Sequence, residues 1–234
     1  MEAAEPERRH RVMSMSTSEP SPKRRRTALV AVTACVAVVL LVAGALFAAA
    51  PSHQPPPAAG PVEVGFTQDM VAHHAQGVEI AAVARDRASD PAVRQLAEDT
   101  ETAQLEELGR MKGWLSLWNQ PETSAGGHMA WMAPQPDHEH GQHAHGSGAT
   151  MPGMASAADL SRLNSLQGAE FDTFFVQLML RHHQGGAPML TEVLQRSQVP
   201  QVRDFAQQVL REQGFEVVEM SRMLSERGAT SLPL

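Results

Sequence analysis

Two pairs of adjacent histidines are the residues of this chain best suited to chemistry. The pairs are His73-His74 and His182-His183. Each pair ends a Met-x-x-His-His sequence, which begins at Met70 or Met179. Imidazole binds Cu, Zn, Fe and Ni, and the methionine thioether favours Cu(I). Four imidazoles in an apolar interior are costly unless they are hydrogen-bonded or bound to a metal. The spacing predicts a buried metal site, and a metal-free polar layer is the alternative.

These pairs belong to an internal repeat. Residues 66–115 recur without a gap as residues 175–224, at a constant offset of 109, and fifteen aligned positions are identical. Agreement of this length indicates two copies of one structural unit.

The apolar spacing within each copy is helical rather than alternating. Asp90-Pro91 is typical of a helix start, with Asp90 as the N-cap and Pro91 in the first turn, and Val199-Pro200 opens the matching helix. Each copy is then a helical hairpin. The sequence predicts an all-α, four-helix up-down bundle made of two repeated hairpins over residues 65–228. Repeat 1 spans 65–118, the crossover loop 119–156 and repeat 2 157–228, whose first helix is expected to begin near Ala157 and to kink at Pro188.

Hairpin register brings the site residues to one level. With turns centred near Ser89 and Gln198, antiparallel pairing places His74 level with Gln104 and His183 level with Gln213. One layer is therefore expected to contain both histidine pairs and both glutamines, the latter orienting the rings from a second shell. Glu107, Glu216 and Asp69 are further candidates to accept a hydrogen bond from a histidine. Four methionines are expected one to two turns from the layer: Met70, Met111, Met179 and Met220.

The crossover loop is a second candidate metal site. It is rich in histidine and methionine, and its densest part contains His138, His140, His143 and His145. This composition is typical of metal-binding segments, and an incidental linker composition is the alternative.

The N-terminal region predicts a membrane segment. Residues 28–50 carry no charge and follow the run Lys23-Arg24-Arg25-Arg26. About 20 apolar residues span a bilayer, and the basic run favours a cytoplasmic N-terminus. We expect a cytoplasmic basic tail (1–27), a single transmembrane helix or signal-anchor (28–50), a Pro/Ala-rich stalk (51–64) and an extracytoplasmic bundle. Secretion after signal cleavage is the alternative.

Charge and missing motifs exclude several classes. The formal net charge is −7, although the first 27 residues contain seven Lys or Arg and only four Glu. The acidic remainder argues against nucleic acid as a partner. The single cysteine, Cys35, excludes a disulfide framework within one chain. Neither copy contains Glu-x-x-His, the sequence that supplies ligands to a carboxylate-rich di-iron site, so such a site is not expected. No phosphate loop or dinucleotide fingerprint is present.

The motifs resemble the bacterial "domain of unknown function 305" family. The resemblance rests on the two Met-x-x-His-His sequences, each followed by Gln-x-x-Glu-x-x-x-Met from Gln104 or Gln213, and it covers about residues 64–228. It implies a ferritin-like helical bundle that is commonly exported, and some members are periplasmic copper-binding proteins. The implied functional positions are Met70, His73, His74, Gln104, Glu107, Met111 and their partners Met179, His182, His183, Gln213, Glu216 and Met220. The chain departs from the pattern where Glu79 is matched by Pro188.

Together these observations predict an extracytoplasmic protein that binds a transition metal, copper above all, for sequestration or hand-over. Binding is expected rather than catalysis. The alternatives are a ferritin-like, metal-dependent oxidoreductase and a metal-free structural or partner-binding bundle.

Overall fold

The computed structural model describes residues 58–133 and 151–234, together with Lys23, Arg26 and helical residues within 30–42. The chain divides into two compact units, residues 1–55 and 56–234. The second unit contains α2 (Pro61–Arg87), α3 (Pro91–Leu117), the 3-10 helix η1 (Ala130–Met132), α4 (Ala157–Ser165), α5 (Gly168–Arg196) and α6 (Pro200–Glu226). The described residues include no strand, so the all-α prediction is confirmed.

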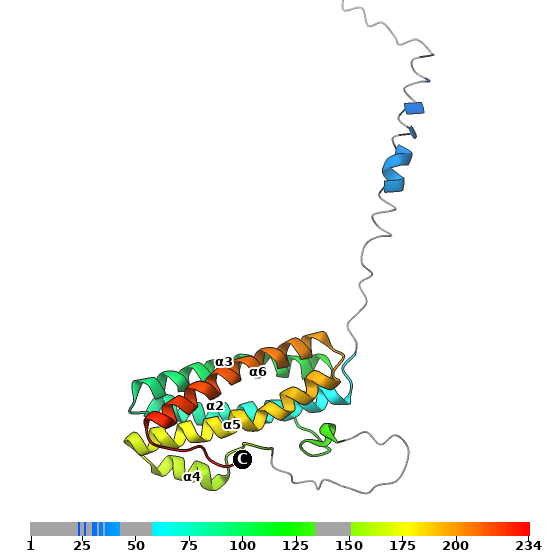
Figure 1. The fold of residues 1–234 in the computed structure, drawn as a ribbon. Helices are drawn as coiled ribbons and strands as arrows, with labels where there is room; N and C mark the ends of the chain where they lie inside the picture. The colour runs from blue at the N-terminus through cyan, green and yellow to red at the C-terminus, as the bar shows by residue number, and fades with distance from the viewer. Residues whose placement is uncertain are drawn as a thin grey trace, which may run out of the picture. The chain divides into compact units, whose positions relative to one another are not determined.

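Four long helices lie side by side in the second unit (Figure 1). α2 packs along α3 and α5 packs along α6, which gives two helical hairpins. The hairpins meet mainly through α2 and α5. The two first helices therefore form the centre of the interface, and α3 and α6 lie further from it.

The hairpin turns lie where the sequence places them. Asp90 caps α3 by accepting a hydrogen bond from the backbone N–H of Ala92 at 2.9 Å, and Pro91 is the first helical residue. Pro200 takes the same position in α6. A capping carboxylate satisfies one of the N–H groups that a helix start leaves without a partner.

Each hairpin also ties down the turn of the other. Ser197, in the α5–α6 turn, donates its hydroxyl to Glu63 of α2 at 2.7 Å. The backbone and hydroxyl of Ser89, in the α2–α3 turn, donate to Asp172 of α5 at 2.9 and 2.6 Å. Glu63 and Asp172 are 109 residues apart, so the two acceptors occupy equivalent positions of the repeat, whereas Ser197 and Ser89 do not.

The start of the second repeat differs from the prediction of one helix from Ala157. Residues 157–165 form the separate helix α4, and α5 begins only at Gly168. Gly168 has φ of +56°, a left-handed conformation that other residues adopt with strain. The chain therefore turns before α5, and α5 then continues through Pro188 to Arg196.

A polar layer divides the hydrophobic core into two clusters. One cluster includes Ile80, Val93, Phe175 and Leu224, and the other includes Phe66, Leu115, Met189 and Val202. On every long helix, histidine or glutamine separates the residues of one cluster from those of the other. The buried polar residues thus occupy one level along the helices.

The N-terminal prediction is not supported. None of the helices within the described residues has the length and apolar character needed to cross a bilayer. The described part of 28–50 consists of helical residues within 30–42, and the rest of that segment lies outside it. The 51–57 part of the stalk and most of the basic tail also lie outside the described residues.

Candidate metal centre

The structure brings both histidine pairs and both glutamines together at the level between the two core clusters. The rings of His73 and His182 stack across the α2–α5 interface with their centroids 3.8 Å apart. Both side chains are fully buried. We call this set of six side chains the histidine layer: His73, His74, Gln104, His182, His183 and Gln213.

Two equivalent glycines make room for the layer. A Cβ atom on Gly77 would lie 2.1 Å from Oε1 of Gln104 and 3.0 Å from Cε1 of His182. A Cβ atom on Gly186 would lie 3.1 Å from Cε1 of His73. Each stacked ring therefore packs against the glycine of the opposite hairpin, and the layer is built across the repeat rather than within either copy.

Three of the four histidines use one ring nitrogen to reach an oxygen. His74 Nε2 lies 2.7 Å from Oε2 of Glu107, and His183 Nε2 bonds equivalently to Glu216. His182 Nε2 donates to the backbone carbonyl of His73 at 2.9 Å. A neutral ring that donates from Nε2 keeps a lone pair on Nδ1. Metal-bound histidines are usually oriented in this way by a carboxylate or a carbonyl.

The other polar atoms of the layer have no hydrogen-bond partner within the described residues. They are Nδ1 of all four histidines, Nε2 of His73, and both amide atoms of Gln104 and Gln213. A buried polar atom without a partner costs about 1–3 kcal/mol. So many such atoms in one layer make it a candidate site for an ion or for water.

Burial sets the charge of the stacked rings. The pKa of His73 is lowered to about 3, chiefly by burial and also by the neighbouring His74 and His183, against a weaker opposing contribution from the Pro152 carbonyl. Burial also lowers the pKa of His182 well below its usual value, together with His73, His183 and His74. Both rings are therefore neutral at pH 7, the protonation state that binds a metal ion.

The four candidate methionines lie on both sides of the layer. Met70 and Met111 belong to one core cluster, and Met179 and Met220 belong to the other. All four are fully buried. The repeat therefore places one pair of thioethers on each side of the histidines.

Asp69 lies against the crossover loop rather than against His73. Its buried carboxylate accepts hydrogen bonds from His128 Nδ1 at 2.8 Å, the Met129 N–H at 2.7 Å and Trp131 Nε1 at 2.8 Å. The i−4 spacing between Asp69 and His73 instead predicts His73 as the partner of this carboxylate. Because the three donors are about 60 residues away in sequence, helical periodicity carries no signal for this contact.

The far end of the crossover loop also packs against the layer, a contact that the sequence pattern does not predict. Residues 151–155, here called the strap, cross α2 and α5. Gln76 of α2 binds both backbone groups of Ala155, at 2.9 and 2.6 Å. Gly153, at φ +81°, packs so closely that a Cβ atom there would lie 3.0 Å from the His182 carbonyl. The glycine at position 153 is the only feature of this segment's sequence that indicates such a close contact.

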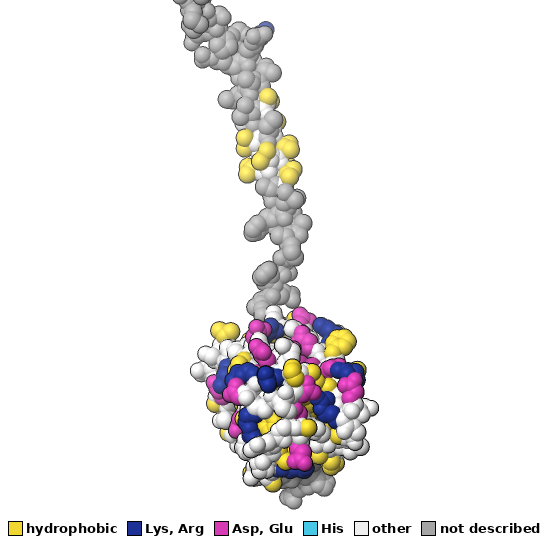
Figure 2. Space-filling model, turned by 90° about the vertical axis from the view of Figure 1, so that its left-hand side faces the viewer, with side chains coloured by type: hydrophobic (Ala, Val, Ile, Leu, Met, Phe, Trp, Pro, Cys, Tyr) yellow, Lys and Arg dark blue, Asp and Glu magenta, His cyan; other side chains and the backbone are white. Residues whose placement is uncertain are grey.

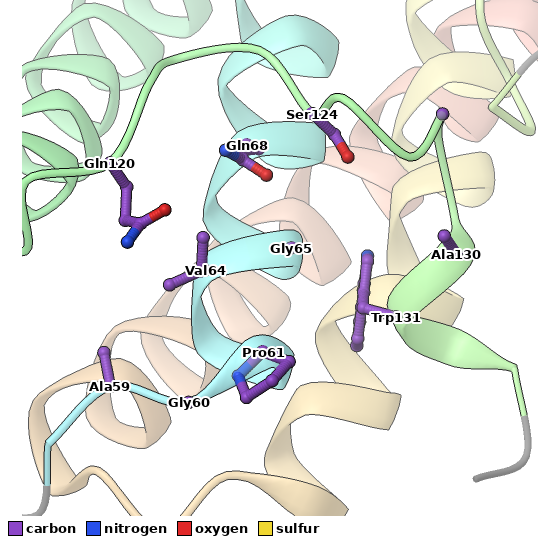
Figure 3. A pocket seen from close by; sticks show the side chains of 11 residues that line it. Ala59, Gly60, Pro61, Val64, Gly65, Gln68, Gln120, Ser124, Ala130 and Trp131 are labelled. Carbon is purple, nitrogen blue, oxygen red and sulfur yellow. The ribbon is translucent and has the colours of Figure 1, made fainter. Parts of the chain in front are cut away.

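A cavity of the described residues lies away from the histidines. It measures about 550 Å³ and lies between the first turns of α2 and the segment around Trp131 (Figure 3). Val64, Gly65 and Gln68 line its α2 side. On the face that Figure 2 shows, basic and acidic side chains are mixed.

No ready-made metal site is present among the described residues. No group of three or more His, Cys, Asp or Glu side chains is arranged there to hold an ion. His138, His140, His143 and His145 lie outside the described residues, so the prediction of a loop site stays a prediction.

The chain belongs to the family "Domain of unknown function (DUF305)", whose model matches residues 63–224. A putative secreted DUF305 protein from Streptomyces coelicolor is 35% identical, with a TM-score of 0.65 over 74% of this chain and 98% of that one. A DUF305 fragment from Deinococcus radiodurans is 33% identical, with a TM-score of 0.59 over 73% and 99%. CopM in its Cu(II)-bound form is 22% identical, with a TM-score of 0.51 over 70% and 96%, which shows a shared fold alone. No curated protein matches the chain.

Proposed function

We propose that this protein binds copper in the histidine layer and serves to sequester it or hand it over outside the cytoplasm. The observation that carries the proposal is the set of Nδ1 atoms that have no partner while their rings are held from Nε2 by Glu107, Glu216 and the His73 carbonyl. A metal-bound histidine is usually held in this way through its other ring nitrogen.

Two further observations support copper. Neutral imidazoles flanked by the buried thioethers of Met70, Met111, Met179 and Met220 suit both Cu(II) and Cu(I). CopM, which shares the fold, has been crystallised in Cu(II)- and Cu(I)-bound forms. Binding by three or more of the four imidazoles requires the rings to reorient, because the described residues hold no preformed group of three ligands.

The proposed location outside the cytoplasm is also supported by a relative. The S. coelicolor relative is described as a secreted protein, which supports an extracytoplasmic site for this chain. An anchor or cleaved signal within residues 28–50 remains our proposal for export. The loop histidines 138, 140, 143 and 145 are proposed as a separate capture segment that supplies ions to the layer.

A metal-free structural layer is the second candidate. It is favoured by the absence of a preformed group of three ligands among the described residues and by the two His–Glu hydrogen bonds, which also exist without metal. In that case the layer would serve only to fix the pairing of the two hairpins.

A copper titration of the full chain with measurement of bound metal separates the candidates. Two matched variants each lose four imidazoles: His73, His74, His182 and His183 to Ala, and His138, His140, His143 and His145 to Ala. We expect the first variant to lose tight copper binding with its helix content intact by circular dichroism, and the second to keep it. Loss in the loop variant alone would move the site to the loop, and no tight binding by the wild-type protein would leave the layer structural.

A further inference from the structure

A small depression between α3 and α6 borders the histidine layer. It measures about 200 Å³, and its walls include Ala103, Glu106 and Glu107 of α3 and Phe205, Gln208 and Glu212 of α6. Ala103 and Glu212 are 109 residues apart, so the depression spans the axis that relates the two repeats. It therefore opens at the same level as the histidines.

Glu107 connects this depression to the buried layer. Its side chain is 12% exposed and lines the depression, while its Oε2 lies 2.7 Å from Nε2 of the fully buried His74. The other nitrogen of that ring, Nδ1, is one of the buried atoms without a partner. Glu107 and the ring of His74 thus lie between the depression and this unsatisfied atom of the layer.

The α2–α5 side of the layer is closed by backbone. A Cβ atom on Gly185 would lie 2.3 Å from the Pro152 carbonyl, so the strap already touches the helix at this point. Gln76 holds the next part of the strap through both backbone groups of Ala155. An ion could reach the histidines from this side only if the strap detached.

We propose that metal cations reach the histidine layer through the depression between α3 and α6, and that Glu107 is the carboxylate that passes them to the histidines. The inference rests on the proposed function, because it needs a metal to bind in the layer. Three carboxylates, Glu106, Glu107 and Glu212, face one basic side chain, Arg110, around the depression. Fixed negative charge at a narrow opening raises the local concentration of cations and speeds their association.

The test blocks the opening without touching a ligand. Ala103→Phe fills the depression, and Thr102→Phe places the same ring on an exposed position of the same helix as the matched control. Cu²⁺ is the probe, and stopped-flow quenching of tryptophan fluorescence follows its uptake, because the Trp114 ring lies 5.3 Å from the ring of Phe205 in the wall. The layer-specific part of the fluorescence change is the part that is lost when His73, His74, His182 and His183 are all changed to Ala.

We expect Ala103→Phe to slow layer-specific uptake and release at least tenfold while the equilibrium affinity stays within about twofold, and Thr102→Phe to behave as wild type. Blocking an entry route lowers the uptake rate and the release rate by the same factor, whereas damage to the binding site changes the equilibrium affinity. Wild-type rates in Ala103→Phe would overturn the route. No layer-specific binding in the wild-type protein would instead overturn the proposed function, and the route with it.

A second variant keeps the test valid if Ala103→Phe does not fold. Glu106→Gln with Glu212→Gln removes two charges from the depression, and Glu98→Gln with Asp99→Gln removes two from an exposed part of α3. We expect the first pair to lower the uptake rate several-fold at low ionic strength, with a smaller effect at high salt. Equal effects of the two pairs would mean that only net charge matters, and that result would overturn the role of the depression.

Discussion

The two hairpins are copies at the histidine layer but differ where the crossover loop packs. His73, His74, Gln104 and Glu107 are repeated as identical residues 109 positions later. Asp69, which binds His128, Met129 and Trp131, is instead matched by Leu178, a buried residue of the core. Gln76, which holds the strap, is matched by Gly185, which the strap touches directly.

This difference separates two structural roles. A layer built across a two-fold relation needs the same residues from both copies, because each ring packs on the glycine of the other hairpin. The crossover loop exists once, so it needs polar partners on one hairpin and small or apolar neighbours on the other. Symmetry therefore marks the candidate metal centre, and asymmetry marks the docking of the loop.

The largest expected effect tests whether the two stacked histidines are equivalent. The pKa of each is lowered in the folded protein, to about 3 for His73, so below pH 6.5 the unfolded chain binds protons that the folded protein does not. Stability present above the ordinary histidine pKa of about 6.5 is therefore lost as the pH falls. We expect the free energy of unfolding to drop by about 4 kcal/mol between pH 7.5 and 5, about half from each ring.

Urea unfolding across this pH range checks the prediction, because most carboxylates titrate only at lower pH. His73→Gln and His182→Gln should each remove about half of the pH dependence. Unequal losses would show that the stacked rings are not equivalent. An unchanged slope in both variants would mean that neither ring is held neutral in the folded protein.

The next largest effect converts one hairpin to the sequence of the other. Asp69→Leu places the residue of the second copy in the first, and it removes the acceptor of three hydrogen bonds from the crossover loop. The Trp131 Nε1–H is buried and would lose its partner, so we expect a loss of about 2–4 kcal/mol in unfolding free energy. Asp86→Leu, an exposed position on the same helix, is the control and should change stability little. A similar small change in both variants would refute the anchoring role of Asp69.

Much of the fold was predictable because the repeat fixes two hairpins and the capping residues fix their turns. Asp90 and Pro91 begin α3 as expected, and antiparallel register then brings His74 and Gln104 to one level. Register does not determine how rings orient, so the stacking of His73 on His182 was not predicted.

Contacts with the crossover loop were beyond the reach of helical spacing. Asp69 has i−4 spacing to His73, yet its carboxylate binds a loop about 60 residues away, and no local pattern encodes such a distant partner. The turn at Gly168 is a similar case. The helix-forming composition of 157–170 continues across this turn, but the helix itself is interrupted there.

The smallest expected effect compares the two hairpin tips. Ser197 is buried and donates to Glu63, whereas Ser89 is exposed and donates to Asp172. The two serines occupy neighbouring rather than equivalent positions of the repeat. Equivalent carboxylates therefore accept a hydroxyl hydrogen bond from non-equivalent positions of the two turns. We expect Ser197→Ala to cost about 1–2 kcal/mol and Ser89→Ala about 0.5 kcal/mol, because water can replace the exposed hydroxyl of Ser89 more readily than the buried hydroxyl of Ser197.

The Glu63 carboxylate offers a second measurement of the same comparison. Burial raises its pKa, but the hydrogen bonds from Ser197 and from the backbone of Glu63 itself, Gly60 and Gln198 outweigh burial, so the pKa is lowered overall. Ser197→Ala should move that pKa upward in an NMR titration, and Ser89→Ala should leave it unchanged. Because a lowered carboxyl pKa stabilises the fold above about pH 4.5, the two variants should converge in stability at lower pH. If they stay apart there, the cost of Ser197→Ala comes from packing rather than from the charge of Glu63.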